Sequence, residues 1–391
     1  MSRSHASPHQ FTEKIDRAVR AAFVAGAKTL PELVGNLPGI YPTVVTESAA
    51  RLNLRLLERP SGRALVVGSK PPRFPLPHPL DFDWRFTSGT LARLVATARP
   101  FLERPGQLFC FGCPSLAMYA KTKMKSDRVR LLDINNPLHE GAEVWHSSAR
   151  TPMKLGRGVV VLDPPWYPGH FREFLWHVRA ACSLGTHVFM AAPSWGTRPS
   201  CGIEMRRLRA WCGRHGFAVL SIAPSALRYV TPLFEHNTLE AQGLRNIPLD
   251  WRTADLWHLK LVSRPAVGAP RKTTASSQWV ERKSGDVRIR IRTGSPVIAG
   301  PASLVPLGTN GFLPTVSVRE ALRGHANVVT SGGRFLKCTD PQAFIDVFNQ
   351  EPSFPNSAAS KPLRLAVARI IKREQDESLR YYEAVSQIAR S

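Results

Sequence analysis

The part of the chain best suited to chemistry is a short turn, Asp163-Pro164-Pro165-Trp166-Tyr167. The four residues before it are apolar, which is typical of a strand buried on both faces. Prolines fix φ and remove backbone donors, so the turn is stiff. Ligands bind at the carboxyl edge of open α/β sheets. A stiff turn at that edge can hold a carboxylate and a large aromatic ring at fixed positions beside a substrate amine.

This turn resembles motif IV of the S-adenosylmethionine-dependent amino-methyltransferases, in the Asp-Pro-Pro-Trp form of adenine-N6 methyltransferases. The resemblance implies that Asp163 and the carbonyl of Pro164 accept hydrogen bonds from the target amine. It also implies that Trp166, with Tyr167, stacks on a flat substrate such as a flipped base. Pro165 completes this candidate catalytic set. The alternative is a proline-rich turn after a core strand, with Trp166 packed as core.

The same resemblance implies a site for S-adenosylmethionine on the two strands that precede the turn. The first of them ends at Gly112, and the second ends in Asp133, an acid placed to bond ribose hydroxyls. The first turn has one glycine where the family usually has two or three, so a degenerate site that binds no cofactor is the alternative. The candidate cofactor-binding residues are Phe111, Gly112, Pro114, Ser115, Asp133 and Asn135.

A second resemblance follows from the order of the motifs, because the glycine turn precedes Asp163. This order matches the unpermuted amino-methyltransferases and also the branched-chain polyamine synthases. The latter are aminopropyltransferases with a helical N-terminal domain, a methyltransferase-like sheet and an Asp-Pro-Pro turn. In that family the matching aspartate would be the base that activates an amine. The charge of the chain argues against a polycationic substrate, since few carboxylates lie near the turns.

The composition points to an anionic partner. The 391 residues hold 53 Lys+Arg against 29 Asp+Glu, which gives a net charge of +24. Such a balance suits phosphate polymers, through counterion release, and it also fits a membrane surface or an acidic protein. No apolar run is long enough to span a membrane, and the N-terminus has no apolar signal segment. We therefore predict a cytoplasmic protein whose partner is DNA or RNA, either as a methyltransferase or as a non-catalytic binding protein on a degenerate fold.

The cysteines predict packing rather than a metal site. Cys110 and Cys113 form one C-x-x-C pair, but no second pair follows at zinc spacing. Six cysteines in mostly apolar contexts suit reduced thiols.

Basic residues in three places are candidates for contacts with nucleic acid. One group precedes and enters a basic helix, a second lies in a basic segment, and a third alternates along a strand, which places its members on one face. Each group has a plainer alternative, a solvated helix face or a strand edge guarded against aggregation. The candidates are Arg198, Arg206, Arg207, Arg271, Lys272, Arg288, Arg290 and Arg292.

Strands alternate with helices from 107 to 262, which predicts an α/β fold with a Rossmann-like class I methyltransferase sheet and helices on both faces. The last two strands are joined by a long connection without a clear helix. Predicted strands are 107–112, 129–133, 143–146, 159–162, 186–191, 217–223 and 255–262; predicted helices are 88–98, 115–123, 169–184 and 203–215.

The regions outside this sheet predict the domain organisation. Three short helices followed by a candidate wing strand at 63–67 resemble a winged-helix module, and a plain helical packing domain is the alternative. The predicted order is a disordered segment 1–10, a winged-helix-like domain 11–68, a proline-rich connector and helix 69–100, a methyltransferase domain 101–263, a basic C-terminal domain 264–351, and a linker with a terminal helix 352–391.

Overall fold

The computed structural model describes residues 8–57, 76–102, 106–133, 143–145, 153–244, 248–266, 268–270, 279–295, 297, 300–349 and 361–388. The chain forms two compact units, each assembled from three segments. The first unit takes Met1–Ser61, Trp84–Val230 and Asp250–Thr274. The second unit takes Gly62–Asp83, Thr231–Leu249 and Ala275–Ser391.

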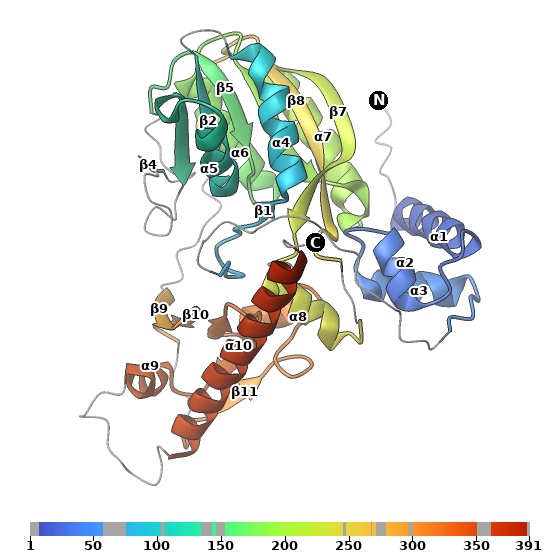
Figure 1. Cartoon of the computed structure of the whole chain (residues 1–391), viewed down its shortest axis with the longest axis vertical. Helices are drawn as coiled ribbons and strands as arrows, with labels where there is room; N and C mark the ends of the chain where they lie inside the picture. The colour runs from blue at the N-terminus through green and yellow to red at the C-terminus, as the bar shows by residue number, and fades with distance from the viewer. Residues whose placement is uncertain are drawn as a thin grey trace. The chain divides into compact units, whose positions relative to one another are not determined.

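The first unit is built on a sheet in the order β1-β7-β8-β6-β5-β2-β3-β4 (Figure 1). Strands β4, β3, β2, β5 and β6 are mutually parallel, whereas β8 runs antiparallel to β6 and β7 runs antiparallel to β8. The strands are β1 (Arg85–Phe86), β2 (Gln107–Phe111), β3 (Val129–Asp133), β4 (Glu143–Val144), β5 (Gly158–Leu162), β6 (His187–Pro193), β7 (Phe217–Val230) and β8 (Arg252–Leu261).

This strand order confirms the predicted sheet. Its parallel part follows the doubly wound pattern, in which the chain starts in the middle and the order reverses between β2 and β5. The last long strand, β8, inserts antiparallel between β6 and β7, as in a class I methyltransferase sheet. Unlike the prediction, β1 extends the sheet beyond β7, where Phe86 pairs with Tyr229.

Helices cover both faces of this sheet because its strands alternate their apolar side chains. Val159 and Val161 pack with α4 (Ser88–Ala98) and α5 (Pro114–Lys123), which lie side by side in Figure 1. Val160 and Leu162 pack on the other face with α6 (Pro168–Ala181) and α7 (Cys201–Arg214). Both faces of β5 are therefore buried, as its continuous apolar sequence predicts.

Three helices precede the sheet in the first unit: α1 (Pro8–Val24), α2 (Leu30–Asn36) and α3 (Pro42–Arg51). Thr29 caps α2 in a capping box with Glu32, which satisfies two backbone donors at the start of the helix. Helix α2 itself contacts the residue just before β8, where Val34 O accepts from the Trp251 indole at 3.3 Å. Helix α1 begins within the stretch predicted to be disordered, and the candidate wing strand lies outside the described residues.

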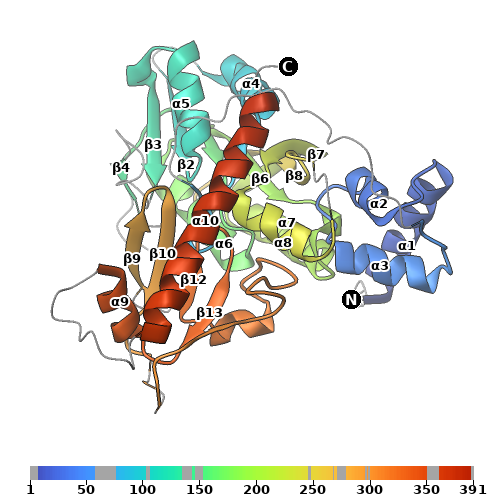
Figure 2. The ribbon, with the colours of Figure 1, turned by 60° about the horizontal axis from the view of Figure 1, so that its bottom comes forward.

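The second unit has an antiparallel sheet in the order β11-β13-β12-β10-β9. Figure 2 shows α10 running across it. Val287, Ile289 and Ile291 of β10 pack with Leu363 and Val367 of α10. The elements are α8 (Leu233–Ala241), β9 (Trp279–Ser284), β10 (Val287–Arg292), β11 (Leu304–Pro306), β12 (Val328–Thr330), β13 (Phe335–Cys338), α9 (Pro341–Asn349) and α10 (Lys361–Ile388). Helix α8 corrects the prediction that no helix joins the last two strands of the first unit's sheet.

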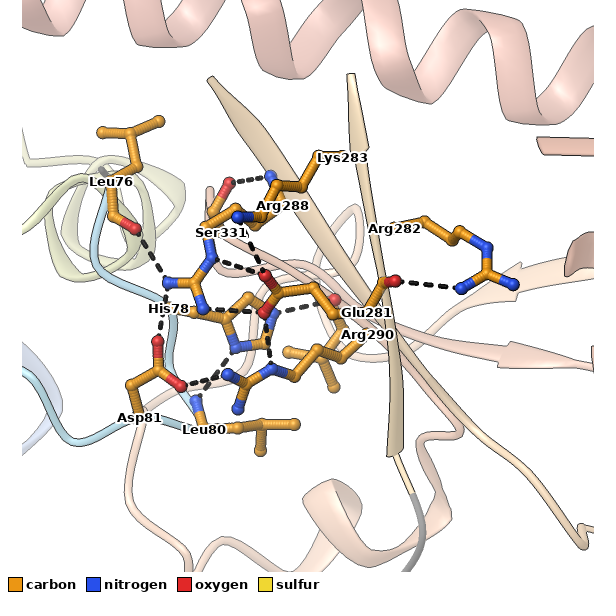
Figure 3. Close-up of polar contacts among 11 residues, drawn as sticks. Leu76, His78, Leu80, Asp81, Glu281, Arg282, Lys283, Arg288, Arg290 and Ser331 are labelled. Atoms are coloured by element: carbon orange, nitrogen blue, oxygen red, sulfur yellow. Dashed lines mark hydrogen bonds and ion pairs between the residues drawn. The ribbon is translucent and has the colours of Figure 1, made fainter. Parts of the chain in front are cut away.

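Two of the three alternating arginines of β10, Arg288 and Arg290, form internal ion pairs rather than a phosphate track (Figure 3). Arg288 is 3% exposed and bonds Asp81 at 2.6 Å and Glu281 at 2.7 Å, and Arg290 bonds the same two carboxylates. The predicted common face is confirmed, but the prediction that Arg288 and Arg290 contact nucleic acid is wrong, because their charges are used inside the unit. The guarded-edge alternative is also wrong, since β10 lies between β9 and β12.

His78 is buried beside this ion-pair network and is held neutral. Its Nε2 donates to Val329 O at 3.0 Å and its Nδ1 accepts from Leu80 N at 3.2 Å. Burial, with the nearby guanidinium of Arg290, lowers the pKa of His78 well below its ordinary value.

This neutral histidine predicts a loss of stability in acid. Below a pH of about 6.5 the unfolded chain binds a proton that folded His78 does not bind. The contribution of His78 is therefore complete above that pH and decreases by about 1.4 kcal/mol per pH unit below it. Urea unfolding between pH 7.5 and 5 measures this slope, and His78→Gln removes that share of it. Equal slopes in the two proteins would contradict the assignment.

A helix needs about 20 consecutive apolar residues to cross a bilayer. No helix within the described ranges meets this requirement.

Candidate functional site

Three predicted site residues lie in one row at the carboxyl edge of the parallel strands. Asp133 ends β3, Gly112 follows β2, and Asp163 follows β5. Phe111 pairs with Leu132 on one side and with Leu162 on the other. The next row is held by hydrogen bonds from Gly112 N to Leu132 O at 3.0 Å and from Asp163 N to Phe111 O at 3.1 Å. Neighbouring strands are about 4.8 Å apart, so the two acids flank Gly112 roughly 10 Å from each other.

The turn after β2 needs only one glycine. Gly112 has φ +64°, and a Cβ there would lie 3.2 Å from the Asp163 carbonyl oxygen. Cys113 follows with φ −135°, and Pro114 and Ser115 then open α5, whose first turn receives no side-chain cap. A left-handed conformation is required at position 112 alone, so the shortage of glycines does not by itself make the turn degenerate.

Two other predicted cofactor residues add no side chain to the described part of this row. The side chain of Phe111 packs in the core, edge-to-face with Trp145, so only its backbone faces the row. Asn135 lies outside the described residues. Asp133 is 5% exposed, and Trp145 N donates to its carbonyl at 3.1 Å.

The half-buried carboxylate of Asp163 is oriented by a residue that the sequence analysis missed. Tyr229 comes from β7, 66 residues away, and its phenol donates to Asp163 Oδ1 at 2.8 Å. Tyr229 is completely buried and stacks on Phe86 of β1. Burial, and then the carboxylate of Asp163, raise the pKa of Tyr229 well above its ordinary value, so the phenol keeps its proton. No pattern in the sequence links the two positions.

Trp166 lies among aromatic rings rather than deep in the core. Its indole is half-buried and nearly parallel to that of Trp84, with 6.5 Å between ring centroids and 14° between planes. Tyr229 meets both indoles edge-on. The guanidinium of Arg252 lies over both rings and donates to the Tyr41 hydroxyl at 2.9 Å. These contacts fix the ring planes beside Asp163.

Arg198 braces the turn from the other side. It donates to Trp166 O at 2.5 Å, pairs with Glu204 at 2.6 Å, and lies over the ring of Tyr167. Its guanidinium therefore positions the turn. The sequence analysis predicts a contact with nucleic acid for this residue. Pro164 is buried, and Tyr167 N donates to Pro165 O at 2.6 Å, which closes the turn before α6.

The remaining basic candidates belong to different parts of the chain. Arg206 and Arg207 are exposed on α7. In the second unit, Arg292 lies over Trp279. Arg271 and Lys272 lie outside the described residues.

The site therefore offers three chemical elements at one sheet edge. A carboxylate and the adjoining carbonyl can accept hydrogen bonds from an amine, an indole can stack on a flat group, and a second acid can bind hydroxyls near a tight backbone turn.

No protein-family model and no curated protein matches the chain. Solved structures do match it. The branched-chain polyamine synthase from Thermus thermophilus, in complex with N4-aminopropylspermidine and 5′-methylthioadenosine, is 17% identical with a TM-score of 0.48, over 67% of this chain and 94% of that one. TrmN from Thermus thermophilus is 15% identical with a TM-score of 0.30, over 66% and 80%.

A geranyl diphosphate C-methyltransferase from Streptomyces coelicolor A3(2), in complex with Mg²⁺, geranyl-S-thiolodiphosphate and S-adenosyl-L-homocysteine, is 11% identical with a TM-score of 0.30, over 66% of this chain and 99% of that one. The fold assignment itself comes from the strand order of the first unit, which is that of a class I methyltransferase sheet.

Proposed function

We propose that this chain is an S-adenosylmethionine-dependent methyltransferase that acts on an exocyclic amine of nucleic acid, with adenine N6 as the target. The observation that carries the proposal is the row Asp133, Gly112 and Asp163 at the carboxyl ends of three adjacent parallel strands. In this row Asp133 would bind the cofactor, Gly112 would let the backbone approach it, and Asp163 would accept from the amine. This is the order that methyl transfer along the sheet edge requires.

The residues of this row fit the cofactor. Asp133 offers a carboxylate for the ribose hydroxyls, and the left-handed turn at Gly112 lets the backbone approach the amino-acid part. Pro114 and Ser115 place the start of α5 beside that turn. S-adenosylmethionine, when bound, supplies an electrophilic methyl group.

The chain contributes mainly by orientation. Asp163 accepts from Tyr229, and a carboxylate has further lone pairs that can accept an N–H of the target amine. The Pro164 carbonyl would accept the second N–H, so the nitrogen lone pair points along the transfer direction. Trp166 would stack on the base. Positioning of this kind lowers the barrier without a strong base.

The charge of the chain supports a nucleic-acid substrate. The net charge of +24 favours phosphate polymers and disfavours a polycationic amine. Within the first unit, the exposed Arg206 and Arg207 lie on α7.

Cofactor selectivity tests the proposal directly. Isothermal titration should show that the protein prefers S-adenosylmethionine to its decarboxylated form, and Asp133→Ala should weaken that binding at least 10-fold because the ribose loses its acceptor. A preference for the decarboxylated form would indicate an aminopropyltransferase instead. Binding of neither form would indicate a non-catalytic nucleic-acid-binding protein.

Product analysis tests the target. Incubation with S-adenosylmethionine and adenine-containing DNA or RNA, followed by digestion and mass spectrometry, should show N6-methyladenine. A methyl group found only on another base would replace the adenine assignment while keeping the methyltransferase.

Tyr229 is expected to act as a positioning residue. Tyr229→Phe removes the donor to Asp163 and should slow methyl transfer about 10- to 100-fold, because hydrogen bonds to charged groups contribute roughly 1.5–3 kcal/mol. The acid limb of the pH–rate profile should move to higher pH, because the hydrogen bond from Tyr229 no longer favours the ionised form of Asp163. The dissociation constant of S-adenosylmethionine should stay unchanged. An unaltered pH–rate profile would show that the phenol only fills space.

A further inference from the structure

A small hollow lies between α6 and α7, directly after the catalytic turn. It has a volume of about 70 Å³. One water needs roughly 10–15 Å³ by this measure, so the hollow has room for a phosphate group. It is lined by Pro168, Arg172, Glu204, Arg207 and Leu208.

The charge inside the hollow is positive. Glu204 is the acid in its lining, and both Nε and Nη2 of Arg198 bond its Oε2, at 3.2 and 2.6 Å. That carboxylate is therefore already neutralised from outside the hollow. Arg172 and Arg207 add two positive charges that this ion pair does not balance.

Arg172 also has a hydrogen-bond donor, its Nε, without an acceptor among the described residues. This Nε is buried from solvent. A buried unsatisfied donor costs about 1–3 kcal/mol, and more when it is charged, so Arg172 gains if its guanidinium shifts toward an anion in the hollow. A guanidinium fork suits phosphate oxygens in particular.

Two features place the hollow beside the bound base. Pro168 begins α6 immediately after Tyr167, so the positive end of a 14-residue helix borders the hollow. Arg198 also joins the hollow to the turn, since it bonds both Glu204 and Trp166 O.

We propose that this hollow binds a backbone phosphate of the nucleic acid whose base occupies the Asp163 turn. The proposal rests on the proposed function for the identity of that base. It makes Arg172 and Arg207 determinants of substrate class, because a free nucleoside or an aliphatic amine has no phosphate to place there.

The test is fluorescence anisotropy with a labelled single-stranded oligonucleotide over a range of salt concentrations. The double variant Arg172→Gln/Arg207→Gln should bind about 10-fold more weakly at 0.1 M salt. Its plot of log K against log salt should be shallower by about 0.7, the slope of one single-strand phosphate contact. The matched control is Lys154→Gln/Arg157→Gln, two exposed residues before β5 at the opposite edge of the sheet, which should bind like the parent protein.

Two further probes separate the sources of the phosphate. An oligonucleotide with neutral methylphosphonate linkages should bind the parent protein at least as weakly as the native oligonucleotide binds the double variant, because it loses every phosphate contact. Adenosine monophosphate should bind far more weakly than the oligonucleotide. The proposal is overturned if the double variant and the control behave alike, if the neutral backbone binds as well as the native one, or if the mononucleotide binds equally well.

Cofactor titration on the same double variant keeps the two proposals apart. Normal S-adenosylmethionine binding together with weakened oligonucleotide binding supports phosphate binding in the hollow. Normal cofactor and oligonucleotide binding overturns the hollow and leaves the methyltransferase proposal standing.

Discussion

Asp163→Ala is expected to slow methyl transfer by about 10²–10⁴-fold while S-adenosylmethionine still binds. The carboxylate is the acceptor that aims the amine, and a positioned group of this kind typically contributes that factor. Asp163 lies roughly 10 Å from Asp133 across the row, so cofactor affinity should hardly change. Single-turnover kinetics with the cofactor in excess measure the transfer step, and titration measures the binding.

A second substitution makes the result sharper. Asp163→Asn keeps the side-chain volume and can still accept from Tyr229, but it loses the charge, so it should transfer faster than the alanine variant and much more slowly than the parent. Asp127→Asn is the matched control, an exposed acid before β3 at the other edge of the sheet. Near-normal turnover in Asp163→Ala would remove motif IV from the mechanism.

Arg334→Met is expected to destabilise the protein by about 3–5 kcal/mol, the usual cost of leaving buried partner charges uncompensated. Arg334 is 3% exposed and bonds Glu374 together with both oxygens of Glu377. Glu374 is 1% exposed and also accepts from Thr330 Oγ1 and Gly332 N, both at 2.7 Å. The network fastens α10 to the turn between β12 and β13.

The chain supplies its own control for this experiment. Arg373→Met removes an exposed arginine that pairs with the same Glu377 at 3.3 Å. Exposed pairs contribute roughly 0–1 kcal/mol, so the free energy of unfolding should change little. Urea unfolding compares the two variants. Equal losses would mean that the burial of Arg334 does not decide its contribution.

Much of the first unit could be predicted from the sequence because its signals are local. The strand ending at Asp133 is predicted with its observed bounds, and the helix Ser88–Ala98 likewise. Buried parallel strands read as short apolar runs, and the turn that follows each run marks its carboxyl end. The row of Asp133, Gly112 and Asp163 follows from those ends alone.

The residues around Asp163 could not be predicted, since they arrive through long-range pairing. Tyr229 lies on β7, which joins the sheet only by pairing with the later strand β8, and Trp84 immediately precedes the two-residue strand β1, which pairs with β7. Neither has a local periodic signal. The prediction for the arginines of β10 failed for a related reason. Their spacing indicates a shared face, but it does not show that Asp81 and Glu281 lie against that face.

The interleaving of the two units along the chain constrains the order of folding during synthesis. The sheet of the first unit lacks β8 until the segment Thr231–Leu249 of the second unit has already been made. Arg334 in turn leaves the ribosome before Glu374 and Glu377, so its charge has no carboxylate from α10 until the last helix emerges. The first unit has all of its segments once Thr274 has been made, before β9 of the second unit, whereas the second unit also needs α10, so the first unit can become native before the second.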